Sequence, residues 1–150
     1  MVDKKREVLE PPLAFLRELW ALDHALASTS KRMHDRIGIT AQQRMVLRFV
    51  GKLPGITAIE LAEILHLERG SLSQALKLLE KRGLVSRRVD TVDRRRTFIE
   101  LTKAGRKFDV PAVGTVERAV ARTLDESSAA DVARVRDLLR RLTDRLSDTT

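Results

Sequence analysis

The sequence contains no cysteine, and aromatic residues make up only 3% of its 150 residues. Without cysteine, the chain can form no disulfide bond, no thiolate metal site and no thiol-based redox sensor, which fits a reducing compartment. No apolar run approaches membrane-spanning length, and the charged start, MVDKKREVLEPP, lacks the apolar stretch of a signal peptide. We therefore predict a cytoplasmic protein that does not bind a membrane and whose core is built from aliphatic side chains.

Motifs of catalysis and of metal binding are missing as well. The sequence offers no paired carboxylates in a plausible cleft and no nucleophile motif, and GKLPG at 51–55 is too short for a phosphate loop and lacks its GK[ST] ending. The histidines, His24, His34 and His66, show no metal-binding spacing with acidic residues. We predict a protein that is not an enzyme and that has no cofactor and no metal site.

The first half of the chain is patterned for helices. Its length suits a single domain, and 43% hydrophobic with 33% charged residues indicates a globular chain. Residues 13–36 place apolar side chains at three- and four-residue spacings. Two capping boxes, Thr40 with Gln43 and Thr57 with Glu60, then predict helices to about residues 50 and 65, with GKLPG ending the first of them.

A longer helix and a hairpin are predicted next. The helix covers residues 71–82, and Gly83 follows it where a left-handed residue is needed. Residues 85–89 and 95–101 are rich in β-branched side chains and are predicted as two short strands joined by a loop at 90–94.

Two more helices are predicted after the hairpin. Thr102 caps the first, predicted over 103–124 with a kink at Pro111. Ser128 and Asp131 open the second. The predicted fold class is mainly α with a small β-hairpin wing.

The first and last helices carry more apolar surface than a small core requires. The last helix repeats Val132, Val135, Leu139, Leu142 and Leu146 at spacings of three and four, which resembles a heptad seam. Packing within one chain is the alternative, but the broad first helix favours a homodimer. The candidate interface residues are Leu13, Leu16, Val135, Leu139, Leu142 and Leu146.

The positive charge of the chain is concentrated around the hairpin. Between Lys81 and Lys107 lie ten basic and three acidic side chains, so this segment holds +7 of the net +8. Such clustering is typical of a surface that binds a polyanion, and double-stranded DNA is the predicted partner.

Two helices of unequal length joined by a tight turn and followed by a basic hairpin form a winged helix-turn-helix. The longer helix is predicted to enter the major groove, and the wing is predicted to reach a neighbouring minor groove, whose negative potential attracts arginine. The candidate DNA-binding residues are Ser71, Ser73, Gln74, Lys77, Arg87, Arg88, Asp93, Arg94, Arg95 and Arg96.

The sequence resembles the MarR family of bacterial transcriptional regulators. The resemblance lies in ELAEILHLERGSLSQALKLLEKRGLVSRR at 60–88 and VDRRRTFIELTKAG at 92–105. It implies one domain over 1–150, with dimerisation helices at 1–36 and 106–150 and a DNA-binding lobe at 37–105. It further implies a homodimer that binds a pseudo-palindromic operator, usually as a repressor, and that a small, often aromatic and anionic, effector releases in many members.

The resemblance also implies roles for single residues. Arg95 corresponds to the arginine at the wing tip that enters the minor groove, and Asp93 to the aspartate that holds it, which we expect to do so through a bidentate pair. Arg94 and Arg96 are predicted to contact the DNA backbone or solvent. Gln74 departs from the family, because many relatives carry arginine there, so the operator sequence cannot be carried over.

An effector pocket is predicted between the dimerisation helices and the DNA-binding lobe. Its candidate lining residues are Arg17, Trp20, His24, Met45, Arg48 and Phe49. The alternative for each is a plain core, interface or surface position. For the whole protein, the alternative is an architectural or nonspecific winged-helix DNA-binding protein without a ligand.

Overall fold

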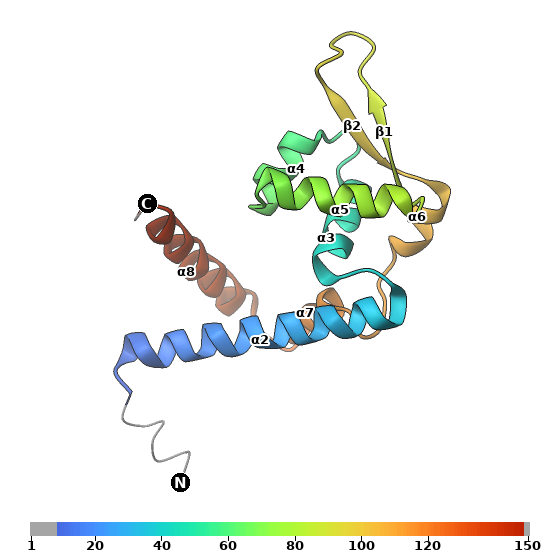
Figure 1. The fold of residues 1–150 in the computed structure, drawn as a ribbon. Helices are drawn as coiled ribbons and strands as arrows, with labels where there is room; N and C mark the ends of the chain where they lie inside the picture. Colours follow the sequence, from blue (N-terminus) through green and yellow to red (C-terminus); the bar gives the residue numbers. More distant parts are fainter. Residues whose placement is uncertain (1–8, 149–150) are drawn as a thin grey trace.

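The computed structural model describes residues 9–148. Figure 1 shows a lobe of helices and a hairpin that stands on the long helix α2. The fold class is as predicted, mainly α with one antiparallel hairpin. The elements in chain order are α2 (Pro11–Ile37), α3 (Ala41–Lys52), α4 (Ala58–Leu65), α5 (Arg69–Lys81), β1 (Val85–Val89), β2 (Thr97–Leu101), α6 (Lys103–Phe108), α7 (Val116–Asp125) and α8 (Ala129–Ser147).

Both predicted capping boxes are confirmed. The Thr40 hydroxyl accepts from the Gln43 amide at 3.2 Å, and the Gln43 side chain accepts from the Thr40 amide at 3.0 Å. Thr57 and Glu60 make the same reciprocal pair at the start of α4. The helix opened by Thr40 runs to Lys52 rather than to residue 50, so Gly51 lies inside it and does not break it.

The turn from α5 into the hairpin is a Schellman motif. Gly83 has φ of 67°, its amide donates to Glu80 O, and the amide of Leu84 donates to Leu79 O. The left-handed backbone at Gly83 is unstrained only for glycine, which confirms the predicted helix end. The motif turns the chain directly into β1, so the hairpin is anchored to the end of α5.

The hairpin is anchored a second time at the start of α4. β1 pairs with β2 in the register Val85 with Leu101 through Val89 with Thr97. The amide of Ile99 donates to Ile56 O at 2.9 Å, beside a bridge between Thr57 and Phe98. The loop is longer than predicted, because β2 begins at Thr97 rather than at residue 95. Arg95 and Arg96 therefore lie in the loop.

The hydrophobic core lies inside the lobe, where α3, α4 and α5 pack together with the base of the hairpin. Its fully enclosed members come from each of these elements, with none from α7 or α8. The largest are Ile39, Val46, Leu47, Leu61, Leu76, Leu79 and Ile99.

The prediction of one kinked helix over 103–124 is wrong. The chain forms α6, a connection over residues 109–115, and then the separate helix α7. Pro111 lacks an amide hydrogen and disfavours helical backbone at Val110, so the helix ends before it. Thr115 then caps α7 through the Arg118 amide. Three helices rather than two therefore follow the hairpin.

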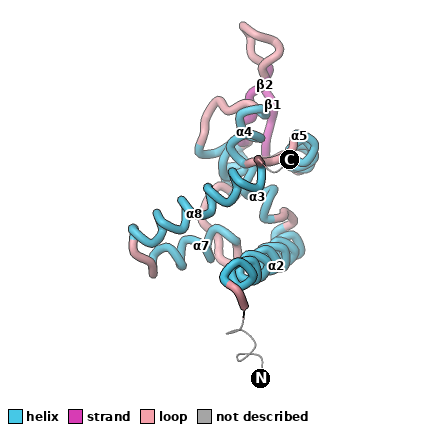
Figure 2. Tube along the Cα trace, turned by 90° about the vertical axis from the view of Figure 1, so that its left-hand side faces the viewer, coloured by secondary structure: helices cyan, strands magenta, loops and turns pink. Residues whose placement is uncertain are grey.

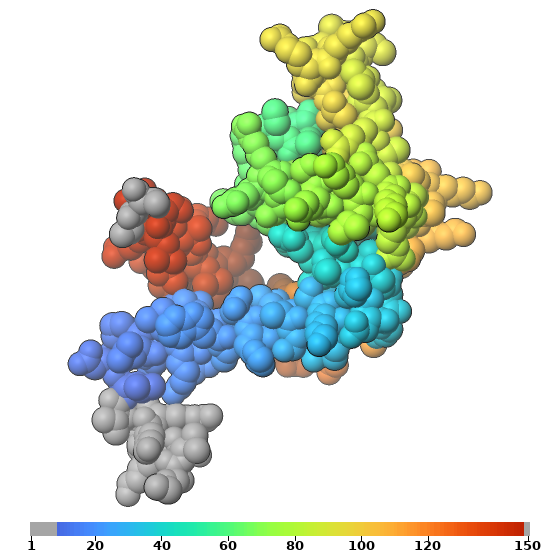
Figure 3. Space-filling view, in the orientation of Figure 1, coloured from blue at the N-terminus to red at the C-terminus, as the bar shows by residue number. Residues whose placement is uncertain are grey.

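The terminal helices are poorly covered within one chain. α7 and α8 contain no buried residue among those described, and α2 contains only Met33. Figure 3 shows α8 separated by a notch from the lobe above α2, and Figure 2 shows α7 and α8 meeting at the turn that joins them. A partner chain would cover these faces, but homodimerisation and the predicted division into lobe and dimerisation helices stay predictions.

No helix within residues 9–148 is long and apolar enough to cross a membrane. In the same part of the chain, no three histidine or acidic side chains lie close enough together to hold a metal ion.

Two glycines offer a matched test of the packing between the hairpin and α6. A Cβ at Gly105 would overlap the backbone oxygen of Leu84, where the hairpin meets α6, whereas a Cβ at Gly70 would meet nothing. We expect Gly105→Ala to lower the free energy of unfolding by about 1–3 kcal/mol. Gly70→Ala should raise it by about 0.4–1 kcal/mol, since the unfolded chain loses freedom. Urea denaturation measures both, and equal effects would contradict the described packing.

Candidate nucleic-acid interface

The exposed face of α5 carries the predicted polar side chains. Leu72, Ala75, Leu76 and Leu79 are buried against the lobe, which leaves the opposite face to solvent. On that face Ser71, Gln74 and Lys77 are exposed, and Ser73 is half-buried in a hollow between α4 and α5. The structure thus brings all four predicted residues onto one helix, with Ser73 the least accessible.

Arg69 was not among the predicted DNA-binding residues. The helix begins there, two residues before the predicted start, and its side chain is exposed at the edge of the hollow that Ser73 also lines. Glu68, at the N-cap, makes no side-chain capping bond. The usual capping signal was therefore missing from this helix start. A charged side chain in the first turn of such a helix is well placed for DNA.

The wing tip presents Arg95 almost entirely to solvent. The Arg95 side chain is 92% exposed, and its Nε lies 3.3 Å from Oδ1 of Asp93. The same oxygen accepts the backbone amide of Arg95 at 3.0 Å. The expected pairing of Asp93 with Arg95 is present but not bidentate, because one carboxylate oxygen receives both donors. Asp93 therefore shapes the loop backbone as much as it holds the guanidinium, and such an exposed pair is weak.

Three of the other wing arginines are held by contacts to α5 or to the hairpin itself. Arg87 pairs with Glu80 at 2.6 Å and Arg88 with Glu100 at 2.9 Å. The guanidinium carbons of Arg88 and Arg96 lie 4.9 and 5.5 Å from the centre of the Phe98 ring. These cation–π contacts hold two cations on a strand that is itself anchored to α4. Arg94 is exposed in the loop.

The charge of the wing also reaches the start of α4. Hydrogen bonds from the amide and the hydroxyl of Thr57, each at 2.8 Å, lower the pKa of Glu60, and the positive charge of Arg96 lowers this pKa further. The ionised carboxylate is thereby favoured at the positive end of the helix. Wing and helix-turn-helix are thus coupled electrostatically as well as through the backbone.

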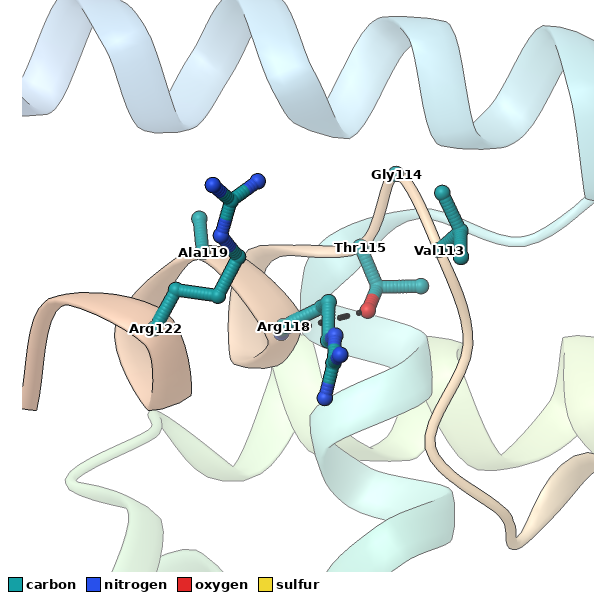
Figure 4. A pocket seen from close by; sticks show the side chains of 6 residues that line it. All are labelled: Val113, Gly114, Thr115, Arg118, Ala119 and Arg122. Atoms are coloured by element: carbon teal, nitrogen blue, oxygen red, sulfur yellow. Dashed lines mark hydrogen bonds between the residues drawn. The ribbon is translucent and has the colours of Figure 1, made fainter. Parts of the chain in front are cut away.

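The candidate effector residues are spread over α2 and α3. Trp20 is 68% exposed, His24 and Met45 are exposed, and Phe49 packs against the core. Arg48 is engaged with Asp109, Nη1 to Oδ1, at 2.6 Å. None of the six lines the hollow of Figure 4, beside the connection before α7, or the groove between α2 and α8.

The chain is similar in sequence to known proteins. Residues 37–96 match the model of the MarR family. The transcriptional regulator HosA of Escherichia coli O157:H7 is 34% identical over 85 residues, which is 57% of this chain and 63% of that relative. The chain thus spans less than two thirds of that protein. The organic hydroperoxide resistance transcriptional regulator of Bacillus subtilis is 31% identical over 105 residues, 70% of each chain.

A solved structure shows the same arrangement. The PcaV transcriptional regulator from Streptomyces coelicolor, in complex with its natural ligand, is 25% identical and has a TM-score of 0.68. The match covers 89% of this chain and 92% of that one.

The cap at Glu60 predicts a specific pH dependence. Because its folded pKa is lowered, the Glu60 carboxylate stabilises the fold above its ordinary pKa of 4.5, and this contribution is lost as the pH falls through the lower folded value. We expect Glu60→Gln to lower the unfolding midpoint at neutral pH. Once Glu60 is protonated in the parent protein, the two proteins should have the same unfolding midpoint. Glu63→Gln, on the same helix, is the control and should follow the parent throughout. A constant difference at every pH would contradict the charged cap.

Proposed function

The chain belongs to the MarR family, and we propose that it is a homodimeric, sequence-specific transcriptional repressor that binds a pseudo-palindromic operator. The observation that supports this most directly is the placement of two DNA-reading elements on one lobe. The polar face of α5 and the exposed Arg95 at the wing tip are fixed to each other by the Schellman turn and by the bond from Ile99 to Ile56. Such a regulator would work in the bacterial cytoplasm.

In this proposal the two elements read adjacent grooves. α5 lies in the major groove, where Gln74 can pair with adenine and Ser71 with several base edges, while Lys77 meets phosphate. Arg69 reaches phosphate or base at the helix start. Arg95 enters the minor groove, where a narrow A·T-rich segment focuses negative potential.

The dimer would place two such lobes one helical turn apart. Apolar side chains on α2 and α8 remain exposed in the single chain, and Phe15, Leu16 and Leu138 line an apolar groove between the two helices. A second copy would bury these faces and relate the two α5 helices by a two-fold axis. The expected spacing between half-sites is then about 34–36 Å.

A small anionic effector is part of the proposal. Nη1 of Arg17 is a buried donor without a hydrogen-bond partner among residues 9–148, while the other nitrogens of this guanidinium face Glu18. A carboxylate would satisfy this donor, and Trp20 on the same helix could stack on an aromatic ring. Because the chain has no cysteine, the effector would act by binding rather than by oxidising a thiol.

The alternative is an architectural protein that binds DNA without regard to sequence. Both proteins would bind DNA with an affinity that falls steeply with salt, so salt dependence does not separate them. They differ in sequence specificity. Competition between a selected duplex and random duplex separates them. A ratio near one between the affinities for the selected and the random duplex would favour the architectural protein.

The wing assignment is tested by Arg95→Ala. We expect the affinity for a duplex selected by the parent protein to fall about 5- to 150-fold, equivalent to roughly 1–3 kcal/mol. Arg134→Ala is the matched control, because Arg134 is an exposed arginine with an equally long ion pair, 3.3 Å to Asp131, on α8. Fluorescence anisotropy measures both. Unchanged affinity in a folded Arg95→Ala protein would refute the role of Arg95.

The dimer is tested by placing a charge on the apolar face of α8. Leu139→Glu would bury an unpaired carboxylate in the proposed interface, so we expect monomers in sedimentation velocity at concentrations where the parent is dimeric. Val92, 93% exposed at the wing tip, supplies the control, because Val92→Glu adds the same charge away from that face. The interface is wrong if both variants sediment like the parent.

A further inference from the structure

The connection between α6 and α7 joins the DNA-binding lobe to the terminal helices, and one buried side chain holds it. Arg44, in the first turn of α3, is 2% exposed although it carries a charge. Its Nη1 donates to Phe108 O at 3.0 Å and its Nη2 to Val110 O at 2.6 Å. Its Nε donates to Oε1 of Glu117 at 2.6 Å. One guanidinium therefore binds the end of α6, the connection itself and the first turn of α7.

The chemistry of these partners explains why an arginine is needed. The carbonyl of Phe108 lies at the negative end of α6, and Glu117 lies in the first turn of α7, where an acidic side chain is favoured. A guanidinium offers five donors in a rigid planar fork, so it can satisfy three acceptors in different directions. Lysine could supply the charge but not this fixed geometry.

A second arginine from the same helix reinforces the contact. Arg48 pairs with Asp109 at 2.6 Å and lies 3.8 Å from Glu117. Asp109 sits so close to Gly51 that a Cβ there would overlap its carboxylate. Two arginines of α3 and two carboxylates of the connection and α7 thus form a charge-balanced cluster, the Arg44 cluster (Arg44, Arg48, Asp109 and Glu117).

The other end of the connection is tied to α2. Arg36 donates through Nη2 to Val113 O, and its guanidinium lies where a Cβ of Gly114 would be. Gly114 has φ of 73°, so glycine is favoured there on two counts. The connection from α6 to α7 is therefore fastened by arginines of both α3 and α2.

We propose that Arg44 is a positioning residue that sets the distance between the two recognition helices of the dimer, through the cluster that fixes the lobe on α7. This inference rests on the proposed dimeric function. Without the cluster the lobe keeps its own core, because the partners of the Arg44 guanidinium lie outside that buried core. Only its orientation relative to the terminal helices becomes variable.

The absence of cysteine allows a direct measurement of this distance. Lys81 is exposed near the end of α5, so Lys81→Cys places one spin label on each recognition helix of a dimer. Pulsed electron resonance then gives the distribution of label-to-label distances. We expect a narrow distribution in the labelled parent and a shifted, broader one when Arg44→Gln is added. Glu117→Gln should act in the same direction with a smaller shift.

Two controls separate positioning from plain loss of stability. Val46→Ala shortens a fully buried side chain on the same helix, and Glu100→Gln removes an ion pair with Arg88 on the hairpin. Both should leave the distance distribution as in the labelled parent. Circular dichroism checks the fold of each protein, and sedimentation checks that it is a dimer. If Arg44→Gln does not fold, the distance distribution of Glu117→Gln tests the inference instead.

The outcomes distinguish this inference from the proposed function. Arg44 is not a positioning residue if Arg44→Gln and Glu117→Gln fold, form dimers and give the distance distribution of the labelled parent. The same conclusion follows if Val46→Ala broadens that distribution as much as they do. In both cases the proposed dimer is unaffected. If the labelled parent shows no dipolar signal, the chain is not a dimer. The proposed function and this inference then fail together.

Discussion

The buried guanidinium of Arg44 is the constraint on which the arrangement of this molecule depends. A charge that is 2% exposed is costly unless every donor finds a partner, and three of its nitrogens find acceptors on the chain around the α6–α7 connection. The connection cannot move away from α3 without leaving that charge unpaired. The path of the chain into α7 and α8 is therefore determined by electrostatics, whereas the lobe is determined by its aliphatic core.

The lobe itself is rigid for a different reason. The Schellman turn at Gly83 and the bond from Ile99 to Ile56 attach the hairpin to both helices of the helix-turn-helix. Recognition helix and wing therefore form one body with a fixed angle between them. A protein that reads adjacent grooves needs this property, because the two elements must follow the geometry of the duplex together.

The sequence predicts those features whose physical cause is local. Capping boxes at Thr40 and Thr57, the left-handed glycine at Gly83 and the polar face of α5 all depend on residues within one or two turns, and all are found. Features with distant causes were missed. Pro111 indicates an interruption of the helix, but no neighbouring residue in the sequence indicates that Arg44 binds the connection there. Two other misses are local. Arg69 precedes the expected helix start because Glu68 makes no side-chain capping bond. Asp93 does not form a bidentate pair because one of its oxygens accepts both the amide and the guanidinium of Arg95. The proposed dimer and effector pocket would depend on surfaces that one chain does not complete.

In the proposed dimer, two rigid lobes held at a fixed distance read a two-fold symmetric site. Hydroxyl-radical footprinting on a duplex enriched from random sequence tests this most directly. We expect two protected segments related by a two-fold axis, about 10–10.5 base pairs apart or a multiple of that spacing. Each should be flanked by protection of the minor groove that the wing enters. Enrichment of no sequence, or one protected segment without a symmetric partner, would contradict it.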